Sequence, residues 1–152
     1  MKNRSLNFLK ICFLFLFVSV ISSFLYVLPS YAAFSLDPSF GTGGKVITTF
    51  GTDAYAVRVA MQSDGKAVAA GYNSNNGHKN WAIGRYNTDG TLDTSFGTNG
   101  IVIRTFGFDE VIHGDAIQPD GKIVVAGSCA SCDGGAIWAV GRYNSDGSVD
   151  TT

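Results

Sequence analysis

The stretch LDPSFGTGGKVITTFGTD (residues 36–53) occurs a second time, with few changes, as LDTSFGTNGIVIRTFGFD (residues 92–109). Two further matches follow: MQSDGKAVAAG (61–71) with IQPDGKIVVAG (117–127), and WAIGRYNTDGTLDT (81–94) with WAVGRYNSDGSVDT (138–151). The offset is 56 residues in the first two pairs and 57 in the third, because the loop after Gly127 has one additional residue. Self-similarity at a fixed period is typical of chains built from stacked structural repeats.

Each repeat is predicted to contain four short strands. Asp64-Gly65 is a strong hairpin signal, and Asp89-Gly90 marks the turn toward the next repeat. No stretch has a sustained 3.6-residue apolar period, and the glycines are too dense for a helix. The predicted strands are 45–49, 54–61, 66–72 and 81–87 in the first repeat, with a variable loop at 73–80, and 101–105, 110–117, 122–128 and 137–144 in the second.

Tandem four-stranded units of this length are typical of β-propeller blades. The recurring motifs LDxSFGxxG, QxDGKxxxAG and RYNxDGxxD resemble the delta-60 repeat family of bacterial exported proteins, over essentially all of residues 36–152. The resemblance implies units similar to propeller blades and no general activity. The predicted fold class is all-β: two tandem four-stranded antiparallel blades of a β-propeller-like array, preceded by a signal-peptide helix.

The predicted repeat domain covers residues 33–152, with repeat one at 36–91, repeat two at 92–148 and the start of a third repeat at 149–152. A blade buries its faces against neighbouring blades, and propellers typically contain about four to eight of them. Two blades therefore leave two apolar faces open. Two explanations follow: a truncated piece of a longer repeat protein, or a homo-oligomer that closes one propeller.

The first 32 residues are predicted to be a cleavable signal peptide. Lys2, Arg4 and Lys10 form a positive start, an apolar run at 11–28 follows, and Ser30-Tyr31-Ala32 supplies the small residues of a cleavage site. We therefore expect a secreted or cell-envelope protein. If residues 11–28 are not removed, the run approaches the length of a membrane anchor.

Charge excludes a nucleic-acid partner. Removing residues 1–32 takes away three of the 11 Lys and Arg residues and none of the 12 acids, which leaves a net charge of −4. A mildly acidic domain lacks the basic surface that binds nucleic acid or anionic lipid. The membrane is therefore expected to contact the protein only through the signal segment.

One loop in each repeat has oxygen ligands at calcium-like spacing. These residues are Asn87, Asp89 and Asp93 in the first repeat, and Asn144, Asp146 and Asp150 in the second. Calcium takes six to eight oxygens, but the acidic residue that ends an EF-hand loop is absent here. The alternative is a turn in which Asp accepts bonds from its own backbone, with no cofactor at all. Arg85 and Arg142 recur with Asp93 and Asp150, which predicts bidentate Arg–carboxylate pairs between neighbouring strands or blades rather than a binding function.

Trp81 and Trp138 begin the last strand of each repeat, either as packing residues or as platforms for a sugar ring. Cys129 and Cys132 occur only in the second repeat. In an exported protein they are predicted to form a disulfide, with free thiols or a metal site as alternatives.

His113 and Asp115 replace Val57 and Val59 of the first repeat and are predicted to share one strand face. They are either bonded internally or part of a ligand or metal site.

No nucleophile elbow and no paired glutamates occur, so no catalytic residue is predicted. We expect an exported non-enzymatic repeat scaffold that binds protein or glycan at or outside the cell surface. The alternative is a fragment or subunit of a propeller enzyme or lectin whose site forms only with further blades.

Overall fold

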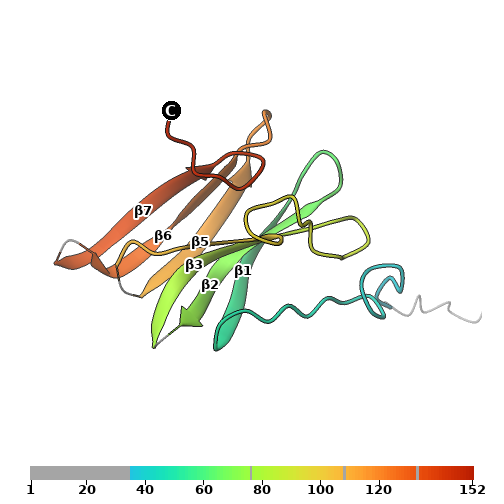
Figure 1. Ribbon diagram of the computed structural model, residues 1–152, viewed down its shortest axis with the longest axis horizontal. Coiled ribbons are helices and arrows are strands. Elements are labelled where there is room, and N and C mark those ends of the chain that lie inside the picture. Colours follow the sequence, from blue (N-terminus) through green and yellow to red (C-terminus); the bar gives the residue numbers. More distant parts are fainter. Residues whose placement is uncertain (1–34, 76, 108, 133) are drawn as a thin grey trace, which may run out of the picture. The chain divides into compact units, whose positions relative to one another are not determined.

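The computed structural model describes residues 35–152 except 76, 108 and 133 (Figure 1). The described residues contain seven strands and no helix: β1 (Asp53–Met61), β2 (Ala67–Asn75), β3 (His78–Tyr86), β4 (Ile101–Arg104), β5 (Glu110–Ile117), β6 (Ile123–Cys132) and β7 (Gly135–Tyr143). Leu36–Thr152 form one structural unit.

The strands form two antiparallel sheets, which confirms the all-β prediction. The first sheet has the order β1-β2-β3-β4, and the second has the order β5-β6-β7. Within each sheet, consecutive strands are neighbours, as in a meander. Short turns join β1 to β2, β2 to β3, β5 to β6 and β6 to β7, whereas residues 87–100 connect β3 to β4. Seven of the eight predicted strands overlap an observed strand, and their ends differ from the observed ends by at most four residues.

The eighth predicted strand, 45–49, is wrong. This segment has no strand partner among the described residues beyond an isolated bridge from Lys45 to Gly41. Its repeat equivalent is β4, which completes the first sheet by pairing with β3, for example Ile83 with Val102. The fourth strand of a sheet thus comes from the following repeat. The boundaries of the sheets are therefore displaced from those of the repeats, and the second sheet has three described strands rather than four.

The predicted variable loop at 73–80 is also wrong, because β2 and β3 continue through it as a hairpin. Asn75 pairs with His78, and Gly77 has the positive φ of 81° that a tight hairpin turn requires. Polar residues on both strands had obscured the alternation that marks a strand.

The predictions for the amino-terminal segment concern residues that lie outside the described part: the signal peptide 1–32, its helix and the apolar run 11–28. Among the described residues, no helix is long and apolar enough to cross a membrane.

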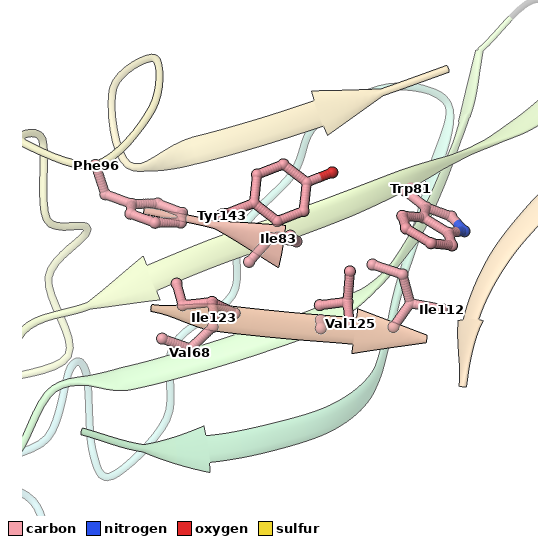
Figure 2. Close-up of a cluster of buried hydrophobic side chains, with 9 residues drawn as sticks. Val68, Trp81, Ile83, Phe96, Ile112, Ile123, Val125 and Tyr143 are labelled. Atoms are coloured by element: carbon pink, nitrogen blue, oxygen red, sulfur yellow. The ribbon is translucent and has the colours of Figure 1, made fainter. Parts of the chain in front are cut away.

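The core lies between the two sheets. One face of the first sheet packs against one face of the second, and both supply buried side chains to a single cluster (Figure 2). Trp81 and Ile83 of β3 and Val68 of β2 meet Ile112 of β5 and Val125 of β6, all at most 1% exposed. Because aromatic and branched apolar side chains dominate burial energetics, this interface is the main source of stability for the unit.

Candidate functional site

An apolar groove lies on the face of the second sheet that points away from the first. It encloses about 430 Å³ and is lined by His113, Gly114, Ala126, Gly127, Ser128, Trp138, Ala139 and Val140. Trp138 is 90% exposed and Val140 is 72% exposed, and both lie on β7. Exposed aromatic and branched side chains gathered on one face mark an interaction surface.

The first repeat shows what normally covers this face. Trp81 and Ile83 hold the same repeat positions as Trp138 and Val140, and each is 1% exposed. The second sheet covers them: a Cβ added at Gly141 would lie 3.1 Å from the Trp81 ring. The groove is therefore the repeat equivalent of an interface between sheets, left without a neighbour among the described residues.

His113 and Asp115 lie on opposite faces, so the prediction that they share a face is wrong. A β-bulge between Ile112 and Gly114 shifts the alternation by one residue. His113 consequently faces the groove, where its Nε2 lies 2.9 Å from Ser128 Oγ. Asp115 pairs with Val125 and faces the first sheet instead.

The Asp115 carboxyl has few groups around it that offset the cost of its burial. Its Oδ2 is buried with no hydrogen-bond partner among the described residues. Burial raises the pKa of the Asp115 carboxyl, while the positive charge of Arg58 on β1 opposes that rise. The two residues that were the candidates for a joint site therefore have separate surroundings.

The carboxylate oxygens of the residues at calcium-like spacing accept hydrogen bonds from the protein itself. Asp89 Oδ1 accepts from the Thr91 amide at 2.9 Å and from its hydroxyl at 2.7 Å, and Asp146 accepts from Ser148 at the same distances. Asn87 and Asn144 donate to the hydroxyls of these same two residues. These contacts close a turn of the Asx type, which is sufficient to explain why both repeats retain these residues.

Asp93 and Asp150 belong to ion-pair clusters. Asp93 Oδ2 lies 2.7 Å from Lys66 Nζ and 2.9 Å from Arg85 Nε. Asp150 Oδ2 lies 2.8 Å from Lys122 Nζ and 2.6 Å from Arg142 Nε. The predicted Arg–carboxylate pairs are thus present, through Nε and one oxygen rather than in a bidentate arrangement. The lysine hydrogen bond is the main cause that lowers the pKa of each carboxyl.

Arg85 also joins the two sheets. Its Nη1 donates to the Ser145 carbonyl in the turn after β7, and its guanidinium lies 4.7 Å from the centroid of the buried Phe96 ring. Arg142, at the equivalent repeat position, donates to the Thr152 carbonyl at 3.0 Å. One arginine therefore bridges to a neighbouring sheet and the other has no neighbouring sheet to bridge to among the described residues.

Cys129 and Cys132 are joined by a disulfide, with Cα atoms 5.6 Å apart, near the end of β6. Sequence reasoning missed the third member of this cluster, Glu110, which is fully buried. Its Oε1 accepts from the amides of Phe106 and Gly107, while its Oε2 has no hydrogen-bond partner among the described residues. Glu110 stands where the first repeat has Ala54, and that difference was a signal available in the sequence.

These three residues are the group among the described ones whose donor atoms lie close enough to hold a metal, within 4.8 Å of one another. In the disulfide, however, neither sulfur is a thiolate, which is the form that ligates metals. The carboxylate instead fixes the loop at Phe106 and Gly107 against the disulfide. A Cβ at Gly107 would approach Cys132 Sγ to 3.0 Å, so a larger residue there would require the disulfide to shift by a few tenths of an ångström.

Comparison with known families supports the repeat architecture. Residues 62–96 and 118–152 each match a family model described as a domain of unknown function (DUF5122) beta-propeller. The two matched segments are repeat equivalents, running from the turn after β1 or β5 through β3 or β7. No curated protein and no solved structure matches the chain. These two segments are therefore similar to β-propeller repeats of unknown function.

Proposed function

We propose that this protein is an exported, non-enzymatic scaffold built from delta-60-type repeats, which binds protein through the groove face around Trp138 and Val140. The contrast between Trp81, 1% exposed, and Trp138, 90% exposed, carries the proposal. The same residue in the same repeat position is a packing residue in one sheet and an exposed anchor in the other. Tryptophan is among the residues most enriched at binding hot spots.

The chemistry of the groove favours a protein partner over a glycan. His113 and Ser128 contribute polar atoms, but these lie within hydrogen-bond distance of each other. The remaining lining is aliphatic, glycine or the indole ring, whereas a sugar needs several free hydrogen-bond partners besides a stacking ring.

The outer edge of β7 strengthens the case for protein. Among the described residues no strand pairs with it, although β4 pairs with the equivalent edge of β3. Unpaired backbone groups along a sheet edge accept an additional strand from a partner. An open edge beside an apolar face suits a β-rich protein.

The enzyme alternative has less support. His113 and Asp115 do not converge, and the proposed scaffold role requires no catalytic group.

Export and a secreted or cell-envelope location rest on residues 1–32 and are part of this proposal; recovery of protein beginning after Ala32 from outside the cytoplasm would test them.

The test is a binding array of purified cell-envelope proteins and glycans, probed with protein expressed from the full chain. We expect protein ligands whose binding falls at least about tenfold in Val140→Lys, because a charge would be buried in the contact. Ser63→Lys, on the exposed turn after β1, is the matched control and should bind like the unaltered protein. Background signal throughout, or ligands insensitive to Val140→Lys, would remove the proposal; ligands that are glycans would favour the lectin alternative.

A further inference from the structure

We infer that the groove face binds a second copy of this chain, head to tail, with Trp138 entering a cavity on the far side of the first sheet. This inference rests on the proposed function, since it names one occupant for the same face. The cavity encloses about 270 Å³ and lies on the face of the first sheet that points away from the second. Both surfaces of the interface, the groove on the second sheet and the cavity on the first, are therefore present on one chain.

The cavity is the repeat equivalent of the place where Trp81 packs. Trp81 packs against the Phe106 ring in a T-shaped contact, with centroids 5.0 Å apart, and lies against Gly141. It shares its buried cluster with Ile112 and Tyr143 (Figure 2). The residues at the equivalent positions of the first repeat all line the cavity: Phe50, Ala56, Gly84 and Tyr86. A pocket formed by one glycine and two aromatic residues is thus present on both sheets. Trp81 fills the one on the second sheet, and the one on the first sheet is open.

A strand is also available for the open edge of β7. The segment Lys45–Thr48 is the repeat equivalent of β4, and its Ile47 is 80% exposed. Tyr86 Oη, which is 2.9 Å from Thr48 Oγ1, holds this segment over the first sheet beside the cavity. Transferring the register of β3 with β4 onto β7 places Trp138 opposite Thr48, Ala139 opposite Ile47, Val140 opposite Val46 and Gly141 opposite Lys45.

The arginine that bridges the sheets has a matching role. Arg85 donates to the Ser145 carbonyl of the second repeat, and the equivalent carbonyl in the first repeat belongs to Thr88. Arg142 of one copy would therefore reach Thr88 of the next. The Trp138 contact, the register of Lys45–Thr48 on β7 and the Arg142 contact are all obtained by moving each contact between the two sheets of one chain forward by one repeat. A single interface between two copies can therefore contain all three.

An interface between different surfaces of identical chains is heterologous, and it produces closed rings or open filaments rather than a two-fold dimer. This property allows a complementation test. Trp138→Lys removes the anchor, and Ala56→Arg obstructs the cavity; both residues are exposed in the single chain, so neither change removes a core contact. Each variant retains one intact surface.

The experiment is light scattering after size exclusion, across a concentration series, on protein expressed from the full chain. We expect the unaltered protein to form assemblies, and each variant alone to lose self-association affinity by at least about thirtyfold. An equimolar mixture of Trp138→Lys and Ala56→Arg should form a heterodimer, because one complementary pair of surfaces survives. Thr94→Lys, at an exposed turn position outside both the groove and the cavity, is the control and should assemble like the unaltered protein.

Unaltered protein that stays monomeric at every concentration would overturn the inference, as would a mixture that stays monomeric. The two proposals fail separately. Ala56→Arg leaves the groove intact, so an array ligand that still binds Ala56→Arg but not Val140→Lys supports the proposed function even where self-association is absent. Assembly without any array ligand would instead support self-association and remove the wider scaffold role.

Discussion

Trp81 and Trp138 hold the same position in the repeat and have opposite surroundings in space. Trp81 fills the seat between the sheets, so Trp81→Ala should lower the free energy of unfolding by about 3–5 kcal/mol. Trp138→Ala should change it by less than about 0.5 kcal/mol when measured on dilute protein, because the ring is exposed. Urea unfolding followed by circular dichroism measures both. Equal effects of the two substitutions would contradict the assignment of Trp81 to the core and Trp138 to a binding surface.

Asp93 links acid stability to its ion pairs with Lys66 and Arg85. The pKa of this carboxyl is lowered in the folded protein, chiefly by the Lys66 hydrogen bond. Its contribution is therefore fully present above the unfolded value of 3.8 and is lost as the pH falls below that value toward the folded pKa. Asp150 follows the same rule through Lys122.

Thermal unfolding between pH 7 and pH 2 tests this linkage. Asp93→Asn should have a lower Tm than the unaltered protein at pH 7, and the difference should shrink below about pH 4. Asp53→Asn, at an exposed position, is the control and should follow the unaltered curve. A difference in Tm that stays constant across the whole range would show that the Asp93 charge does not act through its protonation.

At the scale of the element, the Asn-x-Asp-Gly turns close on their own side chains. Asp89→Ala removes the acceptor of two hydrogen bonds from Thr91 and should lower Tm. Because no metal is required for these contacts, EDTA should leave Tm unchanged for the unaltered protein. A fall in Tm on chelation that is reversed by added Ca²⁺ would restore the calcium hypothesis for Asn87, Asp89 and Asp93 and their repeat equivalents.

The repeat itself made most strands predictable, since turn residues and alternation recur at a fixed spacing. Alternation does not identify the partner of a strand, and for that reason 45–49 was expected to pair while β4 was assigned to the wrong sheet. The bulge at Ile112 and Gly114 has no distinctive residue pattern, yet it places Asp115 on the face opposite His113. The burial of Trp81 depends on a neighbouring sheet, which local sequence does not encode.

At the scale of the whole domain, a sheet is completed by the repeat that follows it. This displacement gives the unit two different ends. One end presents the edge of β7 and the groove at Trp138; the other presents the segment at Lys45–Thr48 and the cavity with Gly84 and Tyr86. In the proposed assembly, copies add in one direction, and each new copy repeats the contact that is present between the two sheets of one chain.

Cross-linking at the predicted register tests this central claim most directly. Val46→Cys and Val140→Cys are prepared as separate single variants in a Cys12→Ser background, mixed, and oxidised with a copper catalyst. We predict a covalent heterodimer in this mixture and none from Ile47→Cys with Val140→Cys, because a shift of one residue turns the side chain to the other face. Equal cross-linking of both mixtures, or none in either, would contradict head-to-tail completion of the second sheet.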